Sequence, residues 1–148
     1  MEKNGFSPIG TNAEQSIRLR DAGLPKKSAD MYLVKHWAYE GELKIMDKHF
    51  DDYPEEGCDH IPAWSLSRLI DLLPESLNYA DDDECMITFQ YSLQIQKDHV
   101  RYYCDEEHPI HFESYGLHTI DAVVDILILL LKDECWREEI FNQIEELS

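Results

Sequence analysis

The chain has 148 residues, of which 43% are hydrophobic and 30% charged, proportions that exclude wholesale disorder and suit one globular domain. Its 31 acidic and 13 basic residues give a formal net charge of −18, which excludes a generic nucleic-acid or anionic-membrane binder because both need cationic patches. The charge is uneven: residues 1–50 hold eight basic and seven acidic side chains, whereas residues 51–148 hold five and 24. Because no signal peptide or membrane-length apolar run is visible, we expect a cytoplasmic protein with no membrane contact.

The first predicted element is a helix over about residues 12–22. Thr11 can act as its N-cap, because Glu14 three residues further on completes a capping box. Gly23 suits the left-handed position just past the end of a helix and favours a Schellman stop. A second short helix is predicted over residues 28–36, so that residues 11–37 form an N-terminal helical pair.

Residues 38–60 predict an irregular acidic segment. Leu43 and Ile45 suggest a short extended piece within it, and residues 51–57 are polar, acidic and turn-rich and predict a loop. The pattern that follows is sharper. With Ser65 as an N-cap, Trp64 and Leu69 have the spacing of a hydrophobic staple. An apolar stripe at helical spacing continues from there, and Pro74 closes the predicted helix.

Three strands are predicted in the middle of the chain, after an acidic loop over residues 78–84. Residues 86–96 alternate between apolar and polar side chains, and a period of two indicates a half-buried strand. The apolar face continues after a turn at residues 97–98, and again after the acidic turn at residues 105–109. This pattern predicts an antiparallel meander.

The register of this meander follows from its apolar face, because a slip of one residue would expose the whole apolar row. The register places Leu93 opposite Tyr102 and Tyr102 opposite Phe112. On the outer face it sets Arg101 opposite Glu113, a favourable cross-strand pair. The remaining predicted pairs are Ile95 with Val100, Tyr91 with Cys104, and Cys104 with Ile110.

Residues 119–132 predict a helix that is apolar almost all round, with Thr119 as its cap. Such a helix is buried, or is shared with a partner. Asp121 and Asp125 are its only charged residues before the end, and they face either water or a basic group, for which Arg68 is a conceivable candidate.

Together these elements predict an α+β fold, a three-stranded antiparallel meander covered on one face by helices, chiefly those near residues 65–73 and 119–132. We expect a single domain over residues 1–148, with a helix–meander–helix core over residues 61–132. Residues 133–148 predict an acidic amphipathic C-terminal helix that either continues the preceding helix or breaks from it. The predicted core residues are Leu69, Ile70, Leu73, Phe89, Leu93, Tyr102, Phe112, Val123, Leu127 and Leu130.

The chain resembles a group of known sequences in two blocks and in the order of the elements that follow them. The blocks are Glu14-Gln15-Ser16, Ala22-Gly23-Leu24-Pro25 and Ser28-Ala29-Asp30-Met31, then Ile61-Pro62-Ala63-Trp64-Ser65-Leu66 and Leu72-Leu73-Pro74. Over about residues 11–132 the chain resembles a group of short proteins encoded on prophages and other mobile elements of gut Bacteroidetes. The resemblance implies a setting, phage or mobile-element biology in the cytoplasm of a host bacterium, and it brings no catalytic residue to transfer.

The residues predict no catalytic, metal or cofactor site. Cys58 with His60, and His108 with His111, contain metal-ligand types but lack the paired spacing of a structural zinc site. Cys104 faces the predicted core, where a thiol is poorly ionised and inert. The chain contains no glycine-rich phosphate loop and no glycine elbow around a serine, so we expect a protein that is not an enzyme.

The acidic surface favours a protein that binds a basic partner protein and inhibits or modulates it. Rows of carboxylates can imitate the charge of a phosphate backbone, so the expected partner is a nucleic-acid-handling or defence protein, with no direct nucleic-acid binding by this chain. The predicted partner-binding residues are Asp81, Asp82, Asp83, Glu84, Asp105, Glu106, Glu107, Glu138 and Glu139.

Two other functions stay open at this point. The first is self-assembly into a homo-oligomer through the apolar helix and the stripe of Trp136, Ile140, Ile144 and Leu147. The second is a metal-dependent hydrolase that uses the histidines. A separate feature is the uncharged outer face of the first meander strand, which could form a hydrogen-bonding platform. That face holds Thr88, Gln90, Ser92, Gln94 and Gln96.

Overall fold

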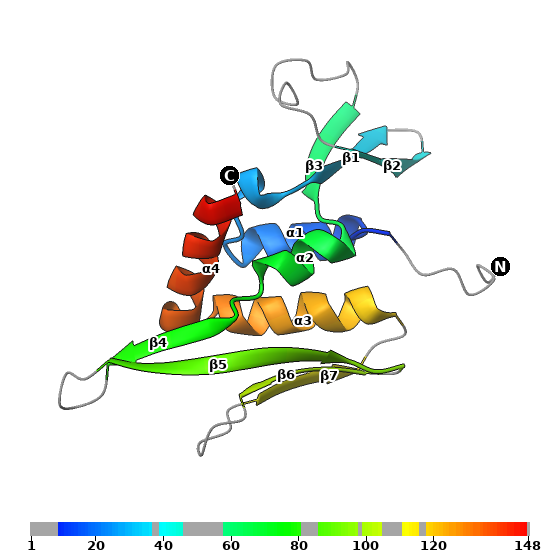
Figure 1. Cartoon of the computed structure of the whole chain (residues 1–148). Coiled ribbons are helices and arrows are strands. Elements are labelled where there is room, and N and C mark those ends of the chain that lie inside the picture. The colour runs from blue at the N-terminus through cyan, green and yellow to red at the C-terminus, as the bar shows by residue number, and fades with distance from the viewer. Residues whose placement is uncertain are drawn as a thin grey trace.

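The computed structural model describes residues 9–36, 39–45, 58–80, 86–97, 99–104, 111–115 and 118–147. Its helical elements are α1 (Ala13–Asp21), the short 3₁₀-helix η1 (Lys26–Ser28), α2 (Leu66–Leu72), α3 (Thr119–Leu131) and α4 (Glu134–Leu147). Its strands are β1 (Met31–His36), β2 (Tyr39–Ile45), β3 (Cys58–Ala63), β4 (Ser76–Ala80), β5 (Met86–Ile95), β6 (His99–Cys104) and β7 (His111–Tyr115). Figure 1 labels these elements along the chain.

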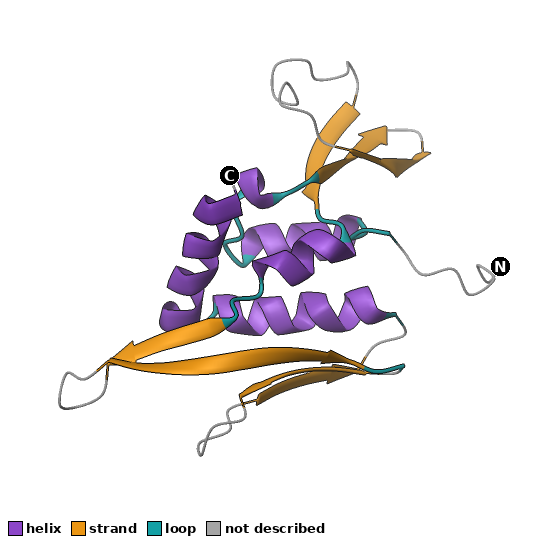
Figure 2. Ribbon diagram, viewed as in Figure 1, coloured by secondary structure: helices purple, strands orange, loops and turns teal. Residues whose placement is uncertain are grey.

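The strands form two antiparallel sheets, one in the order β2-β1-β3 and a larger one in the order β4-β5-β6-β7. α3 lies along one face of the larger sheet, α1 and α2 lie beyond α3, and the smaller sheet lies on the far side of those helices (Figures 1 and 2). The α+β class is therefore as predicted. The predicted three-stranded meander is β5, β6 and β7, and β4 adds a fourth strand to it.

The predicted register of the meander is confirmed. Leu93 lies opposite Tyr102, and Tyr102 lies opposite Phe112. On the outer face Arg101 lies opposite Glu113, and its Nε is 3.0 Å from the Oε1 atom of that glutamate. Two further predicted pairs are present, Ile95 with Val100 and Tyr91 with Cys104. The pair that involves Ile110 lies outside the described residues.

α3 lies at the centre of the fold. Eight of its 13 residues are buried, as its apolar composition predicts. It packs against β6 and β7 on one side and against α1, α2 and α4 on the others. α2 has its extensive contacts with α3 and α4, so the helix predicted over residues 65–73 covers α3 rather than the sheet, and α4 takes the place beside β4. Within the described part of the chain, no helix has the length and apolarity to cross a membrane.

The two aspartates of α3 contact α1. The Gln15 Nε2 atom donates to Asp121 Oδ1 at 2.6 Å, and the Arg18 guanidinium donates to Asp125 Oδ1 at 3.2 Å. The basic group that meets α3 is thus Arg18, and the candidate Arg68 was wrong. These bonds give both carboxylates of an otherwise apolar helix a partner on α1, although 41% of the Asp125 side chain stays exposed.

The start of α2 has the predicted cap and staple. The Ser65 hydroxyl accepts a hydrogen bond from the Arg68 N–H at 3.1 Å, and Trp64 and Leu69 are both fully buried. The same hydroxyl lies 2.5 Å from Asp30 Oδ2, and the Ser65 N–H donates to Asp30 Oδ1 at 2.8 Å. Ser65 therefore ties the start of α2 to the segment before β1.

The end of α1 also has the predicted geometry. Gly23 has a φ of 110°, a conformation that residues with a Cβ rarely adopt. The Leu24 N–H donates to the Leu19 carbonyl at 3.1 Å, and the Gly23 N–H donates to the Arg20 carbonyl at 3.0 Å. This pair of bonds is a Schellman motif, and both leucines are buried in the same core.

Two N-caps differ from their predicted positions by one residue. The cap of α1 is Asn12, whose side chain accepts from the N–H three residues further on at 2.8 Å. Thr11 is buried instead, and its hydroxyl accepts from the Trp64 N–H at 3.1 Å. The cap of α3 is His118 rather than Thr119. In α1, the threonine is engaged by a segment far away in sequence, which a local cap pattern does not reveal.

The prediction of a second N-terminal helix over residues 28–36 is wrong. Only the short η1 is helical, and β1 covers most of the segment predicted as a helix. β1 pairs with β2 on one side and with β3 on the other, so long-range hydrogen bonding overrides a weak local helical signal. Met31 and Leu33 are buried and Tyr32 between them is half-buried, which is the period of a strand.

Two irregular segments are more regular than predicted. The short extended piece predicted at Leu43 and Ile45 is the end of β2, which begins at Tyr39, and β3 begins at Cys58, while residues 46–57 lie outside the described residues. The loop predicted over residues 78–84 begins inside β4, because Asn78, Tyr79 and Ala80 pair with β5. In both places the strand depends on a neighbouring strand that the local sequence does not show.

The predicted core is largely present. The core residues that are buried as predicted are Leu69, Leu73, Tyr102, Val123, Leu127 and Leu130. Leu93 and Phe112 are partly buried against this cluster, and Ile70 is half-buried. The side chain of Phe89 lies outside the described residues.

α4 is a separate helix that packs on the domain. The chain leaves α3 at Lys132 and Asp133, and the Asp133 carboxylate accepts from the N–H groups of Cys135 and Trp136 at 3.0 and 3.2 Å. Trp136, Ile140 and Ile144 are then buried in the same core as α3. Three members of the stripe considered as an oligomer interface are therefore covered within the chain itself.

We predict that Ser65→Ala lowers the free energy of unfolding by about 1–2 kcal/mol, because it removes the cap of α2 and the bond to Asp30. Ser67→Ala, at an exposed position of the same helix, is the matched control and should change stability by less than about 0.5 kcal/mol. Urea denaturation followed by tryptophan fluorescence measures both. Equal midpoints for the two variants would contradict the role of the cap.

Candidate functional site

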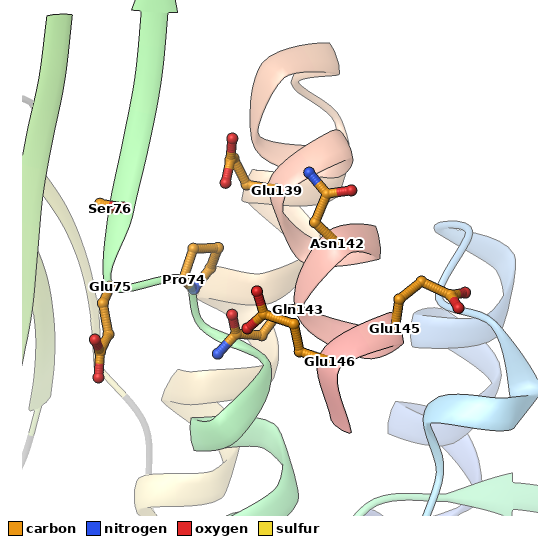
Figure 3. Close-up of a pocket in the computed structure, with 8 residues that line it drawn as sticks. All are labelled: Pro74, Glu75, Ser76, Glu139, Asn142, Gln143, Glu145 and Glu146. Atoms are coloured by element: carbon orange, nitrogen blue, oxygen red, sulfur yellow. The ribbon is translucent and has the colours of Figure 1, made fainter. Parts of the chain in front are cut away.

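The feature that stands out on the described surface is a cleft of about 740 Å³ between α4 and the chain that joins α2 to β4 (Figure 3). One wall belongs to α4 and the other to the start of β4. The lining residues are Pro74, Glu75, Ser76, Glu139, Asn142, Gln143, Glu145 and Glu146. Its volume falls within the range of about 300–1,000 Å³ that is usual for ligand sites.

The helical repeat of α4 explains why its wall is polar. Trp136, Ile140 and Ile144 follow one another at intervals of four residues and point into the core. Glu139 and Glu146, seven residues apart, share the adjoining face, and both project toward the β4 side in Figure 3. Because the buried stripe fixes the rotation of the helix, it also fixes which carboxylates enter the cleft.

The opposite wall follows from the end of α2. Pro74 cannot continue the helix, so the chain turns there and runs into β4. The Tyr102 hydroxyl donates to the Pro74 carbonyl, which joins this wall to the sheet. The Gln143 Nε2 atom donates to the Asp71 carbonyl at 3.1 Å, which joins the α4 wall to α2.

The charge in the cleft is negative and largely uncompensated. Four of the lining residues are glutamates and none is a Lys, Arg or His. Glu145 forms an ion pair with Lys27 and points away from the other lining carboxylates. Among the described residues, Glu75, Glu139 and Glu146 have no such cation partner. The cleft therefore presents three carboxylates that can accept hydrogen bonds from a cationic ligand.

An aromatic cluster lies behind the α4 wall. The Trp136 ring makes edge contacts with the rings of Tyr91, Tyr102 and Phe112 at centroid distances of 4.7, 5.6 and 6.1 Å. Burial raises the pKa of Tyr91 to about 12, with a smaller contribution from Cys104. Burial also raises the pKa of Tyr102 above its usual range, and the charge of Glu139 adds to that shift. The cluster holds α4 against the sheet and so supports the cleft.

The predicted partner-binding residues divide into three groups. Glu139 lines the cleft, whereas Glu138 is exposed on α4 outside the lining. The clusters at residues 81–84 and 105–107 lie outside the described residues. The sequence prediction missed Glu146 and Glu75. The first could have been found from its spacing of seven residues from Glu139, but the second depends on how β4 packs.

The outer face of the larger sheet has balanced charge. Thr88, Gln90, Ser92 and Gln96 are exposed there, as the alternation predicts. Arg101 lies among them and contacts three neighbouring side chains. It pairs with Glu113, donates to Gln94 Oε1 at 3.3 Å and stacks over the Tyr103 ring at 5.0 Å. The described part of this face is thus a polar surface whose one arginine already has its partners.

In the part of the chain that the structure describes, the histidines and cysteines do not converge on a metal site. Within the described ranges, no group of three or more His, Cys, Asp or Glu side chains is arranged to hold a metal ion. His60 lies against the Tyr32 ring at a centroid distance of 5.3 Å. Cys104 is buried, as predicted, and Cys135 is exposed. The cysteines at positions 58 and 85 have no described side chains.

Comparison with known proteins adds nothing to this geometry: no protein-family model, curated protein or solved structure matches the chain.

We predict that stability falls at alkaline pH and that Tyr91 contributes to the loss. A tyrosine in the unfolded chain has a pKa of about 10, whereas burial in the folded protein raises the pKa of Tyr91 to about 12. The stabilisation is complete below about pH 10 and is lost as the pH rises toward 12. Urea midpoints at about pH 9 and about pH 11 measure the loss.

The buried Tyr102, whose pKa is also raised, contributes to the same loss, so Tyr91→Phe should reduce this dependence without abolishing it. Tyr115→Phe, at an exposed position, is the control. If Tyr91→Phe left the difference between the two midpoints unchanged, Tyr91 would not contribute to it.

Proposed function

We propose that this chain is a non-enzymatic acidic protein that binds a basic partner protein and inhibits or modulates it. The observation that carries the proposal is the cleft beside α4, which Glu75, Glu139 and Glu146 line without a cation partner among the described residues. A carboxylate left in that state gains a partner when a Lys or Arg side chain enters, so the cleft is complementary to a basic surface.

The charge of the whole chain supports the same proposal. Residues 51–148 carry five basic and 24 acidic side chains, and they include α4 and the clusters at residues 81–84 and 105–107. An excess of this size attracts a basic partner over a distance of about a Debye length, roughly 10 Å at 0.1 M salt. We propose a nucleic-acid-handling or defence protein as the partner. This chain would occupy the partner's nucleic-acid-binding site in place of DNA or RNA.

The setting is proposed on the resemblance alone. A phage or mobile-element protein in a bacterial cytoplasm would meet many basic nucleic-acid-binding proteins. Solubility is the competing explanation for the charge, since a high net charge by itself keeps a protein soluble. The two explanations differ in one respect: solubility does not depend on where the carboxylates lie, whereas recognition does.

We predict that Glu139→Gln with Glu146→Gln speeds dissociation of a captured basic partner about threefold to tenfold, because both carboxylates face the cleft. The matched control is Glu134→Gln with Glu138→Gln, which removes the same charge from exposed positions of α4 outside the lining. The control should slow association without changing the dissociation rate. Surface plasmon resonance separates the two rates. Equal dissociation rates for the two double variants would show that the cleft is not the contact.

The clusters at residues 81–84 and 105–107 provide a second test. Replacing their acids with Asn and Gln should slow association, and raising the salt concentration should slow it further, because both weaken long-range steering. The domain should stay folded, which circular dichroism checks. Nucleic-acid competition then tests the mimicry. A partner that binds this protein and DNA or RNA at the same time, with no loss of affinity for either, would rule mimicry out.

A further inference from the structure

The larger sheet ends at β4, and this edge has an open side. Among the described residues β4 pairs with β5 alone. The Glu75 carbonyl accepts from the Tyr91 N–H at 2.8 Å, which fixes the alternation of the ladder. In an antiparallel pair every second residue directs its N–H and C=O toward the neighbour. Ser76, Asn78 and Ala80 therefore direct these groups away from β5.

The open side meets the acidic cleft at Ser76. This residue lines the cleft together with Glu139 and Glu146 of α4, and Figure 3 shows the start of β4 and the α4 side chains on opposite sides of the space. Backbone groups and carboxylates that have no partner among the described residues thus border one cavity. An exposed strand edge is a template for pairing with another chain, and many peptides bind proteins by adding a strand.

We propose that the open edge of β4 receives an extended basic segment of the partner protein as an added strand, with its Lys or Arg side chains in the cleft beside α4. This inference rests on the proposed function. It limits the partner to a protein that has a basic segment able to adopt an extended conformation. The backbone of that segment pairs with β4, and every second side chain lies on the same face, where it can reach Glu139 or Glu146.

Charge argues against a second copy of this chain as the occupant. A copy that paired through its own β4 would bring the same glutamates into the same space, and like charges placed together are repelled. A helical segment would leave the outward backbone groups of Ser76, Asn78 and Ala80 without partners, because a helix satisfies its own N–H and C=O groups. An extended basic segment satisfies both the backbone and the carboxylates.

The test uses a short synthetic peptide in which lysine alternates with threonine, labelled for fluorescence anisotropy and titrated with the full chain at low salt. The matched probe carries N-methyl groups on alternate residues, which removes backbone donors and keeps the charge. We expect the unmodified peptide to bind and the N-methylated peptide to bind about tenfold more weakly, because one or two backbone hydrogen bonds are lost. A third peptide, with glutamine in place of lysine, tests the charge.

Two variants test the edge from the protein side. Ser76→Pro removes an N–H that points away from β5, so it should spare the β4–β5 ladder and weaken binding about tenfold. Ser76→Ala keeps that N–H and should bind as the original chain does. Circular dichroism checks that Ser76→Pro is folded. If it is not, the N-methylated peptide decides the question on the unaltered protein.

The outcomes separate the two proposals. Strand addition is wrong if the unmodified peptide does not bind, or if N-methylation and a folded Ser76→Pro leave its affinity unchanged. In either case a basic partner can still bind by charge, and the capture experiment with the α4 variants tests that. If the glutamine peptide binds as tightly as the lysine peptide, recognition by charge fails while pairing at the edge stands.

Discussion

The burial of α3 governs the arrangement of the rest of the protein. Eight of its 13 residues are buried, and each fully buried aliphatic side chain contributes about 1.5–3 kcal/mol relative to exposure. A helix that is apolar on nearly every side needs cover on nearly every side. The larger sheet supplies it through β6 and β7, and α1, α2 and α4 supply it elsewhere. The two charged groups of α3, Asp121 and Asp125, lie where Gln15 and Arg18 of α1 can bind them.

The acidic cleft is a consequence of this arrangement. α4 contributes a narrow apolar stripe to the core, in which Trp136 packs on the aromatic rings of the sheet. The remaining faces of α4 are rich in glutamate and must lie outside. Because α4 packs beside β4, one of those faces borders the chain that leaves Pro74. The cleft combines a wall held by buried contacts with four carboxylates, of which Lys27 pairs with Glu145 and the others have no cation partner in the described part of the chain.

The outer face of the larger sheet and the cleft beside α4 differ in charge. The outer face of the larger sheet pairs Arg101 with Glu113 and is otherwise polar, whereas the cleft at the edge of the same sheet carries an excess of negative charge. A cationic group is therefore attracted more strongly toward this edge of the sheet than toward its face. This contrast connects the excess of acid in the C-terminal two thirds of the chain with a particular place in the fold.

The sequence by itself determined the features that depend on neighbours in the chain. The Ser65 cap, the Schellman stop at Gly23 and the register of β5 to β7 all follow from local spacing, because caps, turns and period-two alternation act over a few residues. The burial of α3 follows in the same way from its composition. These elements cover most of the larger sheet and its helices. Of the cleft, the sequence indicated only Glu139.

Only the tertiary structure decided the features that depend on distant partners. β1 has no strong local signal and becomes a strand because β2 and β3 pair with it. Thr11 does not cap α1 as predicted, because its hydroxyl accepts a hydrogen bond from the N–H of Trp64, 53 residues away. Glu75 and Glu146 meet at one cleft because α4 packs against the start of β4. Contacts of this kind are set by how buried surfaces fit together, and no window of sequence contains both sides of them.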